Sequence, residues 1–87
     1  MANTGYTLLQ ATHAVIAEVK RAKELWPQSA HSAHEAYAIL AEEVDELWDV
    51  VKEKQSTPGR NDRLRKEAIQ VAAMALRFLI EMPDFIC

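Results

Sequence analysis

Four side chains with oxygen ligands recur at a spacing of three residues in two segments of the chain. Glu43 and Glu46 stand three apart, and Glu67 and Gln70 repeat that spacing after a connecting segment. Residues three apart lie on one helix face, so each pair can converge on one ion if both segments are helical. Oxygen ligands with no Cys or His nearby suit Mg²⁺, or Mn²⁺, better than zinc. We therefore expect Glu43, Glu46, Glu67 and Gln70 to form a divalent-metal site.

The apolar residues around these carboxylates strengthen the metal interpretation. Glu43 and Glu46 occupy the middle of a seam that recurs at helical steps and has an apolar residue at each end. Glu67 projects within roughly 20° of Met74 and Phe78, inside an apolar arc of its own segment. A carboxylate on a core-facing seam is costly unless it is paired or binds a cation.

Each of these residues also has a simpler interpretation. Glu43 and Glu46 could form a solvated flank that is salt-bridged to lysines of the first helix. Glu67 could be favoured by the positive end of a helix dipole, because it lies near the expected start of its helix. Gln70 could equally be an ordinary polar residue at the rim.

The turn-forming residues divide the chain into three helix-length segments. They are Gly5, Pro27, Pro58, Gly59 and Pro83. Helices are expected over about 7–25, 32–54 and 63–81. No segment alternates with period two, so the chain is predicted to be all-α.

Residues at the expected helix starts fit known capping patterns. Ser32 with Glu35 three residues later matches a capping box. Asn61 or Asp62 is expected to cap the third helix.

The apolar faces of the helices predict how they pack. The second helix carries an apolar seam at steps of three and four: Tyr37, Leu40, Val44, Leu47 and Val51. The third helix is apolar on opposite sides and needs cover on both. We expect part of that cover to come from a second subunit.

The length of the chain also favours self-association. Eighty-seven residues allow a single domain, 1–87, whose core alone would be marginal. One cysteine cannot form an internal disulfide, which leaves a metal or oligomerisation as the source of added stability. We predict a three-helix chain that completes a helical bundle as a homodimer or a dimer of dimers.

Composition limits the classes of partner. A net charge of −3 without a basic block argues against duplex nucleic acid. No apolar stretch reaches membrane-spanning length, and no basic-then-apolar signal is visible near the first residues. We expect no membrane partner and a cytoplasmic location.

The carboxylate segments resemble a known family. Ala41-Glu-Glu-Val-Asp-Glu-Leu47 followed by Lys66-Glu-Ala-Ile-Gln70 is similar to the paired Glu-Glu-x-x-Glu and Glu-x-x-Asp motifs of MazG-like nucleotide pyrophosphohydrolases. That all-α superfamily includes the dimeric dUTPases and phosphoribosyl-ATP pyrophosphohydrolase. The resemblance covers the second and third helices, about half the chain.

The resemblance implies Mg²⁺-dependent cleavage of a nucleoside triphosphate to the monophosphate and pyrophosphate. It implies that Glu43, Glu46 and Glu67 are metal ligands, and that Glu42 and Glu43 act in catalysis, with Glu42 orienting the attacking water. Gln70 departs from the family pattern, which has Asp there. A neutral amide can still offer its carbonyl oxygen, but it removes one negative charge from the site.

Residues outside the motifs supply candidates for substrate binding. Lys52, Lys54 and Arg63 surround the second inter-helix loop and could contact phosphates, while Trp26 could stack on a nucleobase. Besides the enzyme, two other functions are open. The chain could be a catalytically weak relative that binds nucleotide or protein, or a purely structural helical dimer.

Overall fold

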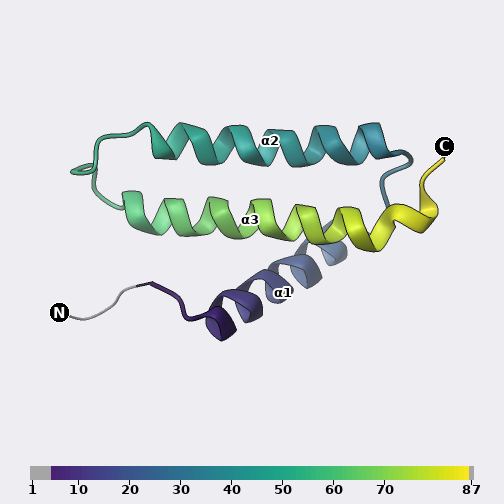
Figure 1. Ribbon diagram of the computed structural model, residues 1–87, viewed down its shortest axis with the longest axis horizontal. Helices are drawn as coiled ribbons and strands as arrows, with labels where there is room; N and C mark the ends of the chain where they lie inside the picture. Colours follow the sequence, from purple (N-terminus) through teal and green to yellow (C-terminus); the bar gives the residue numbers. More distant parts are fainter. Residues whose placement is uncertain (1–4, 87) are drawn as a thin grey trace.

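Three helices make up most of the chain (Figure 1). The computed structural model describes residues 5–86 and contains α1 (Leu8–Leu25), α2 (Ala33–Val51), α3 (Arg60–Glu81) and a short 3-10 turn, η1 (Met82–Asp84). The all-α prediction is confirmed. None of the helices within residues 5–86 is both long and apolar enough to span a bilayer.

Side-chain caps define the starts of the first two helices. Thr7 Oγ1 accepts a hydrogen bond from the Gln10 amide at 3.1 Å, and Gln10 Oε1 accepts one from the Thr7 amide at 2.9 Å. The prediction that Ser32 caps α2 is confirmed, because Ser32 Oγ accepts from the Glu35 amide at 3.1 Å. The second half of the predicted capping box is not found, because the Glu35 carboxylate faces His31 Nδ1 at 3.6 Å instead of the Ser32 amide.

The start of α3 was predicted wrongly. The helix begins at Arg60, and its N-cap is Gly59, not Asn61 or Asp62. Gly59 has a left-handed φ of 75°, which glycine adopts at little cost. This turn lets the helix begin three residues earlier than the side chains of Asn61 and Asp62 indicate, and the Arg60 side chain then donates to the Val51 carbonyl at 2.8 Å.

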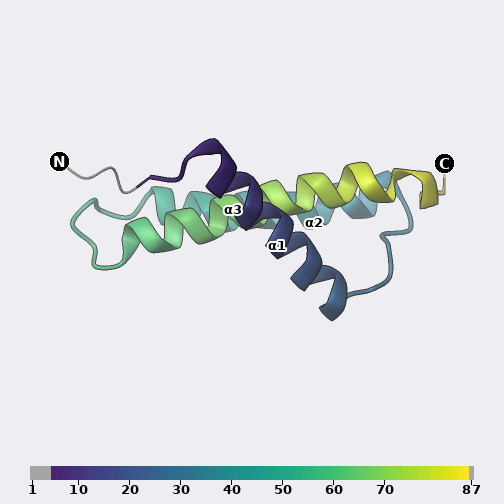
Figure 2. The same cartoon turned by 90° about the horizontal axis from the view of Figure 1, so that it is seen from below.

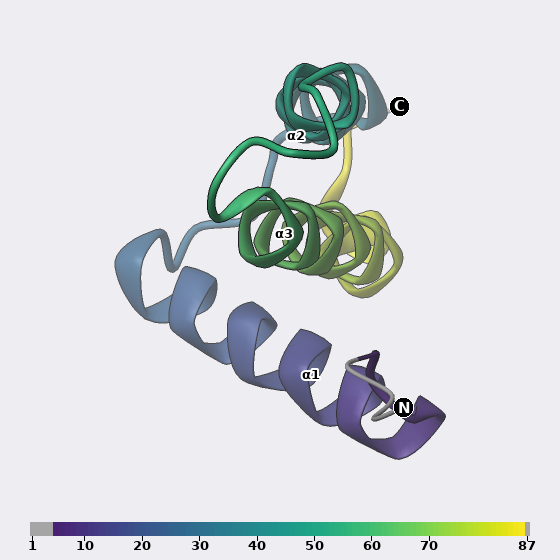
Figure 3. The same cartoon turned by 90° about the vertical axis from the view of Figure 1, so that its left-hand side faces the viewer.

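α3 lies between the other two helices. α2 and α3 run antiparallel side by side, and α1 crosses α3 obliquely on its other side (Figures 2 and 3). The chain therefore covers opposite sides of α3 with its own helices, which accounts for the apolar residues found all round it. Leu79 and Ile80, near the end of α3, remain exposed.

The face of α2 that packs on α3 differs from the predicted seam. Its buried and half-buried positions include a series at alternating steps of four and three: Ala36, Leu40, Glu43, Leu47 and Val50. Three members of the predicted seam, Tyr37, Val44 and Val51, are exposed. The helix is rotated so that Glu43 lies in the centre of the face toward α3.

The core of the chain is made of small side chains. The buried apolar residues in the described part are Ala22, Ala30, Ala36, Val50 and Ala73. Small side chains let helices approach closely but bury little apolar area each. Large apolar side chains stay at the surface, including Tyr37, Trp48 and Leu79, at 65%, 58% and 64% exposure. Self-association, which would cover them, stays a prediction.

Candidate metal centre and the adjoining groove

Three carboxylates meet between the middle of α2 and the N-terminal half of α3. Glu43, Glu46 and Glu67 each place an oxygen within 4.8 Å of the other two. Glu43 faces α3 from the packed side of α2, and Glu46 follows three residues later on the neighbouring edge. Glu43 and Glu67 are half-buried, whereas Glu46 is exposed. The three carboxylates are close enough together to face one cation, and exposed Glu46 leaves the cluster open toward solvent.

Gln70 closes the fourth side of this cluster. In the orientation that matches donors with acceptors, its amide nitrogen donates to Glu43 Oε2 at 3.1 Å and to Glu67 Oε2 at 3.0 Å. Turning the amide by half a rotation directs its oxygen at the same place. The side chain can therefore bridge two carboxylates without an ion or add an oxygen ligand beside one.

Burial and mutual repulsion raise the pKa values of two carboxylates in this cluster. Partial burial, the Glu46 carboxylate, then Glu67 and Glu18 raise the pKa of Glu43 from 4.5 to about 7. Burial and Glu46 also raise the pKa of Glu67, although nearby Lys66 opposes them. A proton or a cation relieves this repulsion, and a divalent cation relieves more of it.

The simpler interpretations of these carboxylates fit the structure poorly. A flank of salt-bridged glutamates would have lowered pKa values, whereas those of Glu43 and Glu67 are raised. Glu67 is also two turns inside α3, because that helix begins at Arg60. The helix dipole acts within the first turn and does not account for it.

A groove of about 660 Å³ adjoins the cluster. Glu43 and Gln70 line it, and it follows α3 past Met74 and Phe78 to the loop that joins α1 to α2. Along α3, Gln70 to Phe78 covers roughly 12 Å. The volume is typical of a small-molecule site, and about half of the lining residues are polar or charged.

Residues of α1 complete the polar end of this groove. Arg21 and Glu18 line it beside Gln70, and both also line a second hollow of about 520 Å³ between α1 and α3. Glu18 accepts from Arg21 Nε at 2.9 Å and from Nη2 at 2.6 Å. This side-on pair fixes the guanidinium and leaves its Nη1 hydrogens for another partner.

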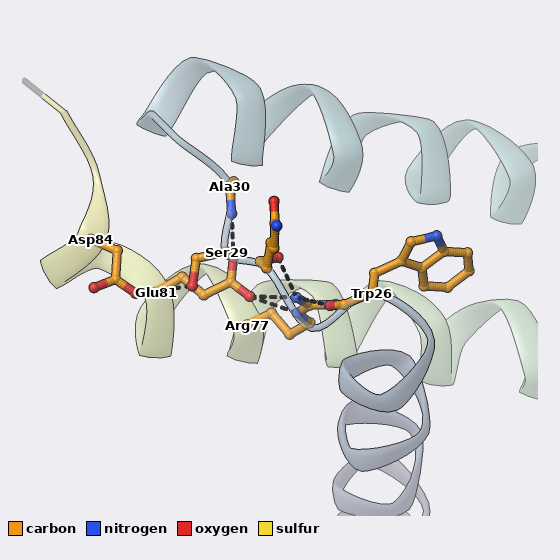
Figure 4. A network of polar contacts seen from close by, with 7 residues as sticks. Trp26, Ser29, Ala30, Arg77, Glu81 and Asp84 are labelled. Carbon is orange, nitrogen blue, oxygen red and sulfur yellow. Dashed lines mark hydrogen bonds and ion pairs between the residues drawn. The ribbon is translucent and has the colours of Figure 1, made fainter.

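A polar network closes the other end of the groove (Figure 4). Arg77 Nε donates to Glu81 Oε2 at 2.7 Å, and Arg77 Nη2 donates to the Trp26 and Gln28 carbonyls at 3.1 and 3.4 Å. Glu81 Oε1 accepts from the Ala30 amide at 3.0 Å. The end of α3 thus holds the loop formed by residues 26–31.

The predicted substrate-binding residues fall in two places. Trp26 lines the groove and is 62% exposed, and Glu42, predicted to act in catalysis, lines it too. Lys52, Lys54 and Arg63 lie at the opposite end of α2 and α3 and do not line either hollow described above. Lys52 pairs with Asp49 at 3.1 Å, and Arg63 pairs with Glu53.

The sequence does not predict that Arg21 and Glu18 line the groove or that Arg77 holds the loop. Arg77 did leave a signal, because it is a charge inside the apolar stretch at 71–80. Glu18 and Arg21 left none, since a charged pair three residues apart on a helix is common on solvated faces.

The donor set fits a hard divalent cation, since it consists of carboxylate oxygens with one amide oxygen in reach. No family model, curated protein or solved structure matches this chain.

Proposed function

We propose that the protein is a Mg²⁺-dependent nucleoside triphosphate pyrophosphohydrolase, which cleaves an NTP or dNTP to the monophosphate and pyrophosphate. The observation that carries this proposal is the meeting of Glu43, Glu46 and Glu67 beside a groove of about 660 Å³, which Glu43 itself lines. The MazG-like motif pattern names the same three residues as ligands. Self-association of the chain is part of the same proposal.

Each part of the site has a task in this reaction. Glu43, Glu46 and Glu67, with the Gln70 oxygen, hold the cation, which supplies charge neutralisation and an acidified water when bound. Glu42 lines the groove beside Glu43, and the motif resemblance assigns it the orientation of the attacking water. The apolar stretch past Met74 and Phe78 receives the nucleoside, and exposed Trp26 offers a face for the base.

Arg21 is better suited to bind phosphate than the loop cations. It lines the groove beside Gln70, and its pairing with Glu18 leaves the Nη1 hydrogens for a phosphate oxygen. Lys52 and Arg63 are engaged with Asp49 and Glu53 away from the groove. We infer that Arg21 contacts phosphate oxygens that the metal does not reach.

Gln70 favours a second candidate function, nucleotide binding with little turnover. The amide supplies no negative charge, so cation affinity and water activation are both weaker than with the family's Asp. In this case nucleotide and Mg²⁺ stabilise the fold without release of pyrophosphate.

Pyrophosphate release from the eight common ribo- and deoxyribonucleoside triphosphates tests the enzyme. The unaltered protein is expected to act on at least one of them with Mg²⁺ and not with EDTA, and Glu46→Ala and Glu67→Ala are expected to abolish release. If neither the unaltered protein nor Gln70→Asp releases pyrophosphate from any of the eight, the enzyme proposal is wrong.

Thermal stability then separates the two remaining functions. Stabilisation by nucleotide without turnover supports the binding function. A neutral or stabilising Glu67→Leu with no nucleotide response supports a purely structural dimer, because the substitution removes a poorly compensated charge.

A further inference from the structure

We propose that Arg77 and Glu81 are positioning residues for the nucleoside end of the groove. They hold residues 26–31 as a fixed wall and set the place of Trp26. This inference rests on the proposed function, because it assigns that wall to the nucleoside part of the substrate.

The contacts of this pair are unusual for a surface ion pair. Arg77 and Glu81 are each only 12% exposed at the side chain, and they lie one turn apart on α3. Together they bond to three backbone groups of one loop, those of Trp26, Gln28 and Ala30. Figure 4 shows both side chains of the pair directed at that loop.

The segment after α3 adds further bonds to the same loop. Ser29 Oγ donates to Asp84 Oδ2 at 2.9 Å, and the Ile86 amide donates to the His31 carbonyl at 2.7 Å. Phe85 packs edge-on against Phe78 with 5.4 Å between ring centroids. The wall is therefore tied to the end of α3 and the residues that follow it.

The wall needs this restraint because the packing around it is slight. Ala30 is the one residue of 26–31 that is buried, and its side chain is a single methyl group. Trp26 itself is 62% exposed, so apolar contact alone does not fix its ring. Arg77 Nη2 bonds to the carbonyl of this same residue.

Placement in the groove separates a positioning role from simple support of the fold. Arg77 and Glu81 line the groove together with Trp26 and Phe78. Movement of the wall changes the space offered to a nucleoside, while Glu43 and Glu67 stay held by the packing of α2 on α3. Loss of the pair should therefore weaken nucleotide binding and leave cation binding intact.

Arg60 provides a matched control at the opposite end of α3. It also donates from its guanidinium to a backbone carbonyl of another segment, Val51, at 2.8 Å. It does not line the groove. Arg60→Gln thus removes the same kind of bond without touching the wall.

The experiment compares Arg77→Gln, Arg77→Lys, Glu81→Gln and Arg60→Gln with the unaltered protein. Each is assayed for pyrophosphate release with the best substrate of the eight nucleoside triphosphates and for Mg²⁺ affinity by calorimetry. Arg77→Gln should raise KM on the order of tenfold and change kcat by less than about twofold, the pattern of lost uniform binding. Arg77→Lys keeps the charge but loses the fork, so it should recover only part of the effect.

A second readout follows the wall directly. Trp48→Phe leaves Trp26 as the one tryptophan, since the chain has two. In that background Arg77→Gln should lower Trp26 fluorescence anisotropy, and Arg60→Gln should not. This measurement needs no turnover, and Glu81→Gln replaces Arg77→Gln in both readouts if the latter does not fold.

The outcomes separate this inference from the proposed function. Unchanged KM and anisotropy in Arg77→Gln, or equal changes in Arg60→Gln, overturn the positioning role while the enzyme stands. A total lack of pyrophosphate release overturns the proposal that the protein is an enzyme. The positioning role is then judged by anisotropy and by calorimetric affinity for the same eight nucleotides. If none of these binds, both are wrong.

Discussion

Two charged clusters on the α2–α3 hairpin differ in how their charges are balanced. Around the loop that joins the helices, Arg63 pairs with Glu53 and Lys52 pairs with Asp49. In the middle of the hairpin, Glu43, Glu46 and Glu67 are instead drawn together. The loop cluster is electrostatically complete within the chain, whereas the central cluster is completed by a proton or a cation.

The loop cations are poor candidates for phosphate binding because Lys52, Lys54 and Arg63 do not line the groove, whereas Arg21 does. The central carboxylates gain by binding a cation, because the cation relieves the repulsion among the three. Substitutions in one cluster can therefore be tested with the other cluster as their control.

The largest effect is expected on turnover. Glu67→Gln keeps the shape of the side chain but removes a ligand charge, so pyrophosphate release should fall on the order of 100-fold or more. Glu53→Gln makes the same chemical change in the loop cluster and should leave the rate within about twofold. Equal losses in the two variants would mean that the central cluster has no special part in the reaction.

The next effect is on stability in the presence of metal. Mg²⁺ at about 100 times its dissociation constant should stabilise the unaltered protein by roughly 2.7 kcal/mol. Thermal melts should show this increase in Glu53→Gln and not in Glu67→Gln. A similar increase in both variants would place the bound ion elsewhere.

The pH dependence of the metal-free protein is a third test. The pKa of Glu43 is raised from 4.5 to about 7, so the folded state favours the protonated carboxyl. The contribution of Glu43 to stability is then greatest below this interval and falls as pH rises through it, because the folded state must bear the ionised group. Glu43→Gln should flatten the fall in Tm between pH 5 and about 8. A Tm that rises over this interval equally in both proteins would contradict the raised pKa.

Gln70→Asp should have a smaller effect, in the direction of gain. The added carboxylate should strengthen Mg²⁺ binding several-fold and raise the rate of pyrophosphate release. It should also lower metal-free stability, since it adds a fourth negative charge to the cluster. Calorimetry checks the gain in Mg²⁺ affinity, and thermal melts on the same preparation check the loss of metal-free stability. A loss of Mg²⁺ affinity would show that Gln70 does not face the ion.

The smallest effect is expected from Lys52→Ala. Its pair with Asp49 is exposed on both sides, and such pairs contribute about 0–1 kcal/mol. Urea melts should show a change near the lower limit, and KM should not move. A large rise in KM would show that Lys52 contacts the substrate.

Much of the fold was predictable because local signals dominate in helices. Gly59 and the prolines gave the three segments, and Ser32 gave the start of α2. The start of α3 was missed because backbone bonds and the left-handed Gly59 replace a side-chain cap there. Which side of α2 faces α3 was also missed, because two apolar seams compete and their choice depends on packing against the rest of the chain.

The site was predictable where residues interrupt a pattern and not where they follow one. Glu43 and Glu67 interrupt apolar arcs, and the structure brings them together with Glu46. Arg21 looks like any charge on a solvated helix, and its place beside Gln70 depends on how α1 crosses α3. Arg77 interrupts an apolar stretch, but its partners in the loop are 49 and 51 residues away along the chain.

The most direct test of the central claim is a calorimetric titration of the metal-free protein with MgCl₂ at a pH above 7, where Glu43 is largely ionised. We expect one Mg²⁺ site per chain in the unaltered protein and in Glu53→Gln, and none in Glu67→Gln. Absence of binding to the unaltered protein, or binding that survives Glu67→Gln unchanged, would contradict a metal centre at Glu43, Glu46 and Glu67.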